Sequence, residues 1–365
     1  MFSYDEEKNI FEKYYSSDSR ALIWDIFEDS QNQIWGIDAF GGAYVIDQES
    51  GQPANIDGSD GLDFNKVWTT LVDDKGRIWL GTEDGLAVYD RNTKIVKFIT
   101  ENEGLIANYM YNLMMDSKGR IWVLGSGRGV SVVDPEKGEI KQLRSEKELN
   151  NNRVTEAVED RSQTIWLGGF AGELLQYDPS SDKLRVFRDS LSVDRINDLK
   201  TDQENTIYIG TQGEGIHILN PETNVRKTLT TQNALISDDN MSLEFDDRGI
   251  LWAAGLKGVE RIDLSKKKIS LFRKDQGLAA NDIYAIALKE GRIYLGNSKG
   301  VTVLEPQSVE KDTWNAFTIG NDQGMIETDI SQNSFSFDSE GYLWAGSNAL
   351  MLNVIDPVVT DTMSY

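Results

Sequence analysis

An aromatic residue that follows Ile or Leu recurs eight times along this 365-residue chain. Consecutive copies lie 42 to 44 residues apart, except the last, which follows after 50. Six of the nine tryptophans occupy this position, so chance does not account for the spacing. A fixed period of this length predicts one supersecondary unit repeated along the chain, since each unit must stack on its neighbours to bury its apolar face. The anchors of the repeat are Trp35, Trp79, Trp122, Trp166, Tyr208, Trp252, Tyr294 and Trp344.

One unit, residues 105–155, shows what each copy contains. Residues 111–116, 121–124 and 130–133 have the alternation or the apolar runs of strands, and residues 140–143 predict a fourth, outer strand. Helical periodicity is absent. Four short strands in about 44 residues are typical of a propeller blade. The sequence therefore predicts an all-β, closed β-propeller of four-stranded blades, in which residues 1–365 form a single domain.

The two chain ends bear on the number of blades. Eight anchors predict eight blades, and seven blades plus one leftover unit is the alternative, because residues 2–5 and residues 350–356 both resemble a third strand. The last unit has no convincing outer strand. We expect residues 10–14 to supply it and to close the ring, since closure removes exposed sheet edges.

An aspartate stands six residues before the anchor in seven of the eight units. We expect each aspartate to cap its own turn through hydrogen bonds to the backbone, rather than to bind calcium, because a feature of nearly every unit belongs to the scaffold. The anchors are expected to pack between blades for the same reason. Unit seven lacks the aspartate, and Gln163 stands where other units have Gly or Asn. The aspartates are Asp29, Asp73, Asp116, Asp160, Asp202, Asp246 and Asp338.

The composition excludes several classes of site. The chain has no cysteine, which excludes thiol nucleophiles, disulfides and cysteine metal sites. A catalytic triad or a zinc site would depend on the single histidine, His217, which lies in an apolar strand and is expected to be buried. The net charge of −23 disfavours nucleic acid as a partner. We expect no metal and no cofactor.

The sequence contains no apolar run of about 18 residues and no recognisable signal peptide. We therefore expect no membrane-spanning segment in this chain. Two locations remain open at this point: the cytoplasm, or the outside of the cytoplasm as a fragment of a longer, anchored protein.

The consensus of the units resembles the two-component regulator propeller repeat. The clearest copy runs over residues 61–90 and contains Asn65, Asp74, Gly76, Trp79 and Gly85. The resemblance implies the extracytoplasmic, periplasmic sensor region of a hybrid histidine kinase of Bacteroidetes, whose ligands are often glycan fragments. It also implies partner domains outside this chain, namely a second propeller and an immunoglobulin-like sandwich domain. Propellers of this family usually have seven blades, so the count of eight anchors departs from it.

A ligand site is expected at one mouth of the channel, on the segments before each first strand and the turns after each anchor strand. These positions differ between units while the scaffold repeats. Aromatic rings can hold the face of a sugar, and arginines can donate several hydrogen bonds to it. The rim positions that are not among the chosen residues carry Phe40, Lys66, Asp84, Tyr111, Phe170, Gln212, Asp239, Lys257 and Lys299. The predicted ligand-binding residues are Trp24, Trp68, Tyr109, Arg128, Arg153, Arg195 and Tyr284.

The sequence thus favours a ligand-sensing propeller with no catalytic residue, whose ligand is a neutral or weakly anionic oligosaccharide or another small molecule. One alternative is a scaffold that binds a protein, including a second copy of itself. The other is a propeller glycosidase or lyase. A glycosidase needs two carboxylates about 5–9.5 Å apart, and 60 acidic residues leave room for such a pair.

Overall fold

The structure is a computed structural model. It describes residues 2–5, 10–13, 23–29, 31–38, 42–46, 53–56, 67–90, 93, 95–126, 129–144, 153–170, 172–187, 193–308, 313–321, 325, 328–337, 339, 341, 343–347 and 352–355. By its internal contacts the chain divides into two compact units. We call Val67–Leu243 the central unit, and Met1–Lys66 with Glu244–Tyr365 the terminal unit. Within the described residues there is no α-helix, and 3-10 conformation occurs in the short helix η1 (Lys274–Gln276) and at Asn321.

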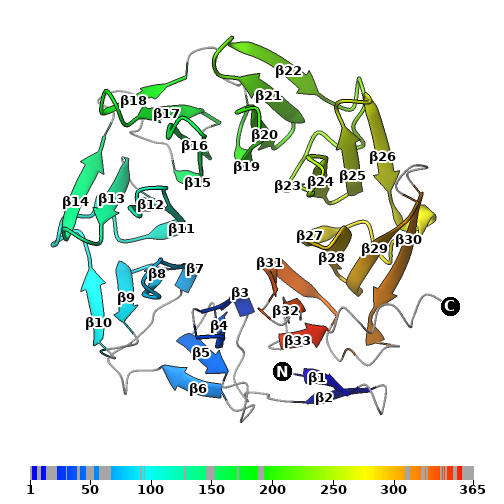
Figure 1. The fold of residues 1–365 in the computed structure, drawn as a ribbon, viewed down its shortest axis with the longest axis horizontal. Coiled ribbons are helices and arrows are strands. Elements are labelled where there is room, and N and C mark those ends of the chain that lie inside the picture. The colour runs from blue at the N-terminus through cyan, green and yellow to red at the C-terminus, as the bar shows by residue number, and fades with distance from the viewer. Residues whose placement is uncertain are drawn as a thin grey trace. The chain divides into compact units, whose positions relative to one another are not determined.

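The central unit contains four sheets of four antiparallel strands each (Figure 1). In each sheet the strands pair in chain order. The sheets are β7 (Val67–Val72), β8 (Ile78–Thr82), β9 (Leu86–Asp90) and β10 (Ile95–Ile99); β11 (Met110–Met115), β12 (Ile121–Gly125), β13 (Val130–Asp134) and β14 (Glu139–Leu143); β15 (Val154–Glu159), β16 (Ile165–Gly169), β17 (Leu175–Asp178) and β18 (Lys183–Val186); and β19 (Ile196–Thr201), β20 (Ile207–Thr211), β21 (Ile216–Asn220) and β22 (Val225–Leu229).

The terminal unit contains the other four sheets, and one of them has five strands. The sheets are β3 (Ile23–Glu28), β4 (Ile34–Asp38), β5 (Gly42–Ile46) and β6 (Pro53–Ile56); β23 (Ser242–Phe245), β24 (Leu251–Gly255), β25 (Gly258–Asp263) and β26 (Lys268–Phe272); β27 (Ile283–Lys289), β28 (Arg292–Asn297), β29 (Gly300–Ser308) and β30 (Thr313–Ile319); and β2 (Ile10–Lys13), β1 (Phe2–Asp5), β33 (Leu352–Ile355), β32 (Leu343–Ser347) and β31 (Ile330–Phe337).

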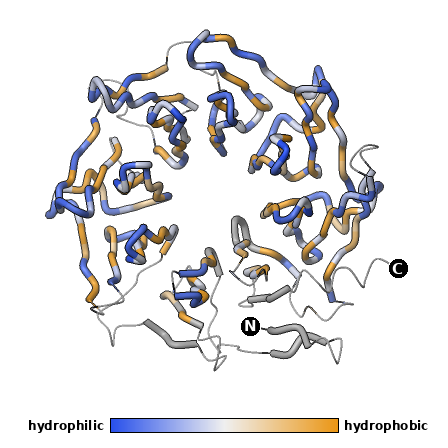
Figure 2. Tube along the Cα trace, viewed as in Figure 1, coloured by the Kyte–Doolittle hydropathy of each residue, from blue (hydrophilic) through white to orange (hydrophobic). Residues whose placement is uncertain are grey.

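The eight sheets are the eight blades of a β-propeller, as the eight anchors predict. In the central unit the first strands, β7, β11, β15 and β19, lie along one edge, and the fourth strands lie on the opposite, outer edge (Figure 1). Every residue of the second strands β8, β12, β16 and β20 is buried, whereas outer strand β10 is mostly exposed. Hydrophobic residues recur in each blade, with hydrophilic turns between them (Figure 2).

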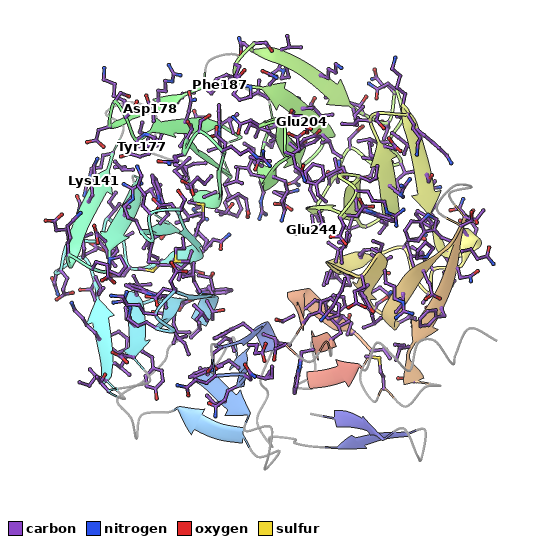
Figure 3. All side chains as sticks on the ribbon, in the orientation of Figure 1. Lys141, Tyr177, Asp178, Phe187, Glu204 and Glu244 are labelled. Atoms are coloured by element: carbon purple, nitrogen blue, oxygen red, sulfur yellow. The ribbon has the colours of Figure 1, made fainter. Side chains whose placement is uncertain are left out.

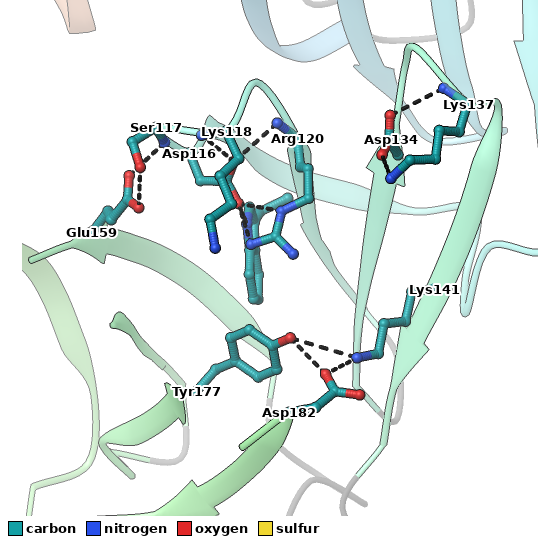
Figure 4. A network of polar contacts seen from close by, with 11 residues as sticks. Asp116, Ser117, Lys118, Arg120, Asp134, Lys137, Lys141, Glu159, Tyr177 and Asp182 are labelled. Carbon is teal, nitrogen blue, oxygen red and sulfur yellow. Dashed lines mark hydrogen bonds and ion pairs between the residues drawn. The ribbon is translucent and has the colours of Figure 1, made fainter. Parts of the chain in front are cut away.

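The anchors fill the space between neighbouring blades, as predicted. Trp122 is fully buried and contacts Tyr177 of the next sheet edge-on, with ring centroids 5.1 Å apart. Trp166 is fully buried in a cluster with Ile196 and Leu199 of the next sheet. Phe187, which follows β18 of its own sheet and is labelled in Figure 3, contacts it edge-on at 5.1 Å. Polar contacts also join the sheet of Trp122 to the sheet of Tyr177. Lys141 on β14 and the Tyr177 hydroxyl both donate a hydrogen bond to Asp182, which lies between β17 and β18 (Figure 4).

The turn aspartates that the structure describes cap their turns, as predicted, while Asp338 lies outside the described residues. Asp73 Oδ1 accepts hydrogen bonds from the backbone N–H of Lys75 (3.0 Å) and Arg77 (2.9 Å). Its second oxygen accepts the indole N–H of Trp79 at 2.9 Å, a bond that the sequence analysis did not anticipate. Burial raises the pKa of Asp73, but its bonds with Trp79 and Arg77 outweigh burial and lower the pKa overall. The spacing of six residues between aspartate and anchor therefore lets one carboxylate cap the turn and also bind the buried indole.

Two departures from the turn pattern have physical explanations. Gln163 adopts the same left-handed conformation as Asn205, with φ of 62° against 65°, so the unusual residue leaves the turn unchanged. In unit seven, β27 and β28 are joined by only Glu290 and Gly291, both at positive φ. A two-residue hairpin of this kind has no place for a capping aspartate.

The prediction for closing the last sheet is wrong in its strand order. We expected residues 10–14 to pair with the C-terminal strands. Instead β1 lies beside β33, in parallel, and β2 pairs with the far side of β1. Residues 2–5 and the third strand of the last unit therefore do not compete for one place, because both fit in a five-stranded sheet. The two ends of the chain still meet in one sheet, as expected.

Candidate functional site

One backbone position before the first strand is repeated in three consecutive blades of the central unit. Its residues are Tyr109, Arg153 and Arg195. In each case the carbonyl accepts a hydrogen bond from the residue that follows the second strand. These bonds run from Ser126 N to Tyr109 O (2.9 Å), from Phe170 N to Arg153 O (3.1 Å) and from Gln212 N to Arg195 O (3.0 Å).

The same contact explains two glycines at the ends of second strands. A Cβ atom on Gly125 would lie 2.2 Å from the Tyr109 carbonyl oxygen, and one on Gly169 would lie 1.9 Å from that of Arg153. A backbone oxygen cannot give way at such distances, so only glycine permits the close approach. The repeat therefore fixes the backbone of the rim and leaves its side chains free to differ.

These side chains form a continuous row of aromatic rings over three blades. The Trp68 and Tyr109 ring centroids are 5.8 Å apart, and those of Tyr109 and Tyr111 are 5.1 Å apart. The row continues from Tyr111 to Phe170 at 5.9 Å. Such separations are within the range of favourable aromatic contacts. We call Trp68, Tyr109, Tyr111 and Phe170, with the two arginines described next, the rim cluster.

Two arginines meet at the Phe170 end of the row. The Arg195 guanidinium carbon lies 4.1 Å from the centroid of the Phe170 ring, and that of Arg153 lies 5.9 Å from it. Both are within cation–π range. Arg153 is exposed and Arg195 is half-buried, and the buried Nε of Arg195 has no hydrogen-bond partner. Phe170 itself is 38% exposed, so a hydrophobic ring flanked by two cations faces solvent.

Charge is distributed unevenly along the rim cluster. At the Tyr109 end, burial raises the pKa of the tyrosine hydroxyl, and the carboxylate of Glu83 raises it further. At the Arg195 end, burial and the neighbouring Asp198 raise the pKa of Glu156 well above its ordinary value. Both Glu83 and Arg153 therefore act on the Tyr109 end, while the Arg195 end combines two arginines with Glu156 and Asp198.

The structure brings together four of the seven predicted site residues: Trp68, Tyr109, Arg153 and Arg195. Arg128 and the side chain of Trp24 lie outside the described residues. Tyr284 belongs to the terminal unit, where its hydroxyl donates to Asp282 at 3.0 Å.

The selection by sequence missed Phe170, which contacts three other members of the rim cluster, and Tyr111, which links it to Tyr109. Both were among the rim positions. The Phe170 N–H bonds to the Arg153 carbonyl, and the equivalent bond recurs in the neighbouring blades. The register of the repeat could therefore have placed Phe170 beside Arg153.

Three observations bear on the enzyme interpretation. The described residues contain no group of three or more His, Asp or Glu side chains that could hold a metal. Asp198 accepts backbone N–H groups on both oxygens, from Leu199 and Leu243 at 2.7 Å each, so it serves the sheet. His217 is 6% exposed, with Nδ1 3.1 Å from Thr228 Oγ1. Burial, with a smaller effect of Arg226, lowers the pKa of His217 to about 4.

In the part of the chain that the structure describes, no helix has the length and apolarity needed to cross a membrane.

Comparisons with known proteins agree with the motifs. A profile described as two component regulator propeller matches residues 61–84 and 104–127. Histidine kinase P4 of Formosa agariphila is 25% identical over 293 residues, which are 72% of this chain and 21% of the kinase.

Two solved structures share the fold. The extracellular domain of the hybrid two-component system BT3049 from B. thetaiotaomicron superposes with a TM-score of 0.64 at 17% identity, covering 100% of this chain and 55% of that one. Virginiamycin B lyase from Staphylococcus aureus gives a TM-score of 0.57 at 14% identity, covering 79% of this chain and 94% of the lyase. Such low identities show a common fold and not a common activity. This chain spans about a fifth of the kinase and about half of the extracellular domain. It is a β-propeller in which residues 61–84 and 104–127 match the two-component regulator propeller.

Proposed function

We propose that this chain is a ligand-sensing propeller in the extracytoplasmic region of a hybrid two-component system, and that it binds an oligosaccharide at the rim cluster without transforming it. The observation that carries the proposal is the convergence of Trp68, Tyr109, Arg153 and Arg195 with Phe170 in one row. These residues come from four consecutive blades. Ordinary rim residues have no reason to gather in this way.

The chemistry of the rim cluster suits a saccharide. Sugars have apolar ring faces, which pack on aromatic rings, and hydroxyl edges, which accept and donate hydrogen bonds. The row of rings offers the first kind of contact, and the planar guanidinium groups offer several donors each. The rings are held by a backbone that repeats, so the site is formed before the ligand arrives, which limits the entropy lost on binding.

The signalling role rests on the repeat and on the similarity to the histidine kinase and to an extracellular sensor domain. Under this proposal the chain works outside the cytoplasm, as one domain of a longer protein. Its eight blades act as a single domain. Its partners are a second propeller, a sandwich domain or a second copy of itself, and these pass the binding event on to the kinase.

The test is a thermal-shift screen with oligosaccharides prepared from neutral and acidic plant and algal polysaccharides. A ligand that binds only the folded state raises the melting temperature. We expect at least one oligosaccharide to do so, and we expect Trp68→Ala to abolish the shift. Phe98→Ala is the control, since Phe98 is an exposed ring on outer strand β10, away from the rim position.

The alternatives give different results in the same screen. Conversion of an oligosaccharide to a new product would contradict the non-catalytic proposal. If no saccharide shifts the melting temperature while a second copy or another protein binds in a Trp68-dependent manner, the rim cluster belongs to a protein-interaction scaffold.

A further inference from the structure

The arginines of the rim cluster differ from three others in the described residues, Arg77, Arg120 and Arg292, in making no ion pair. Arg77 and Arg120 pair with turn aspartates, with N–O distances of 2.6 Å, and Arg292 pairs with Glu305 at 2.7 Å. Among the described residues, neither Arg153 nor Arg195 makes an ion pair. In a protein with 60 acidic residues and 37 basic ones, two adjacent cations without a carboxylate are unexpected.

The nearest acidic side chain to interact with Arg195 does not neutralise it. Glu156 on β15 lies within electrostatic range of Arg195, Asp198 and Lys200. Burial and the repulsion of Asp198 raise the pKa of Glu156 well above its ordinary value. Asp198 in turn is held by two backbone N–H groups. Because neither guanidinium group makes an ion pair within the described residues, both can bind an anionic group of a ligand.

We propose that Arg153 and Arg195 bind the carboxylate of an acidic sugar, a uronate unit of the oligosaccharide, beside the ring of Phe170. This inference rests on the proposed function and adds to it the chemical class and the orientation of the ligand. The uronate lies at the Phe170 end of the row, beside the two arginines, and the second sugar ring lies toward Trp68 and Tyr109, whose aromatic rings can hold its apolar face.

The geometry of the charges favours a carboxylate. A guanidinium group matches a carboxylate with two parallel hydrogen bonds, and such charge-assisted bonds are about twice as strong as neutral ones. Two guanidinium groups on the same ring can surround one carboxylate from two sides. The guanidinium carbon of Arg195 already lies 4.1 Å from the centroid of the Phe170 ring, so this side chain is held at the proposed site.

The protein's net charge of −23 does not oppose this inference decisively. Repulsion between an anionic ligand and distant surface carboxylates is screened beyond roughly 8 Å at physiological salt. A contact ion pair at hydrogen-bond distance is screened much less. The local pair of arginines therefore decides equilibrium affinity, while the net charge slows the approach of the ligand.

The experiment uses uronate-containing disaccharides from polygalacturonate, alginate and hyaluronan. Each is paired with its carboxyl-reduced analogue, in which the carboxylate becomes a primary alcohol and the rest of the sugar is kept. Binding is measured by calorimetry on wild type, Arg153→Gln, Arg195→Gln and the control Arg185→Gln. Arg185 is exposed on outer strand β18 and bonds to Gln176 at 2.8 Å, outside the rim cluster.

We expect one of the uronates to bind roughly tenfold or more tightly than its reduced analogue, the ratio given by a charge-assisted hydrogen bond of about 1.5–3 kcal/mol. Each rim substitution should remove most of this preference, while Arg185→Gln should keep it. Equal affinity for the uronate and its reduced analogue, with binding still lost in Trp68→Ala, would overturn the acidic-sugar inference and leave the proposed function standing. No Trp68-dependent binding of any saccharide, in this set or in the thermal-shift screen, would overturn both.

Discussion

Two sets of residues in the central unit differ in how they vary between blades. We call the turns with the capping aspartates the turn layer, and the positions of the rim cluster the rim layer. In the turn layer, the same aspartate–aromatic link recurs from blade to blade, as in Asp73 with Trp79 and Asp116 with Trp122, both 2.9 Å. Where tyrosine replaces tryptophan, the link persists, since the Tyr208 hydroxyl donates to Asp202 at 2.9 Å. In the rim layer, one backbone position carries Tyr109, Arg153 and Arg195, each with a different neighbour. Residues that repeat from blade to blade thus hold the blades together, whereas residues that vary on a fixed backbone form the surface available for binding.

The largest effect is expected from the repeated layer. Trp122→Ala should lower the free energy of unfolding by about 3–5 kcal/mol, because it empties a fully buried aromatic site between two blades. Urea denaturation followed by intrinsic fluorescence measures this difference. A loss of less than about 1 kcal/mol would mean that the anchors do not form the core between blades.

The second prediction concerns His217, a polar residue of the interior with no part in the site. The pKa of a histidine is near 6.5 in the unfolded chain and about 4 here. Between these pH values the unfolded state binds a proton that the folded state does not, so stability falls as the pH drops through this window. The contribution is up to about 3 kcal/mol. The free energy of unfolding of His217→Gln, followed over the same pH range, should lack this part of the decline. Parallel curves for the two proteins would contradict the buried, neutral histidine.

A smaller effect is expected from the capping carboxylate. Asp73→Asn should destabilise the protein by about 1–3 kcal/mol, because the charged acceptor of the Trp79 indole and the Arg77 guanidinium is lost. Its pKa is lowered in the folded state, so its contribution is present above the ordinary pKa of aspartate and disappears as the pH falls through the folded value. Denaturation of the two proteins at neutral and at acidic pH measures both effects. A difference that grows toward acidic pH would have the wrong sign.

The smallest effect on stability is expected in the rim layer. Phe170→Ala should change the free energy of unfolding by about 1 kcal/mol or less, because the ring is exposed and its main contacts are with two arginines. Chemical denaturation of Phe170→Ala and Trp122→Ala under the same conditions compares the loss of unfolding free energy at the two positions. Equal losses at the two positions would remove the distinction between scaffold and site.

Much of the fold follows from the sequence because propeller blades are built from local hairpins. The period of the anchors gives the number of blades, and the expected strands of residues 105–155 agree with β11 to β14 to within one or two residues. The order of β1, β2 and β33 was not predictable in the same way, because strands from opposite ends of the chain pair without a local turn to set their register.

The site was predictable only in part, and for a physical reason. The register of the repeat places Tyr109, Arg153 and Arg195 at equivalent positions, so their common location follows from the sequence. Which rings touch depends on side-chain conformations and on the bend of each turn. Phe170 is the centre of the rim cluster because its ring contacts Tyr111 and Arg195, and these side-chain contacts could be found only in the structure.

The central claim, that the variable rim is the binding surface, is tested most directly by calorimetry on Phe170→Ala and Phe98→Ala with the oligosaccharide that stabilises the wild type. Both phenylalanines are 38% exposed, so each substitution removes a ring of equal accessibility, one from the rim cluster and one from outer strand β10. The account predicts that Phe170→Ala weakens binding about tenfold or more, as expected for the loss of an aromatic contact together with its two positioned arginines, and that Phe98→Ala leaves the affinity unchanged. Unaltered binding in Phe170→Ala, or equal weakening in both proteins, would contradict it.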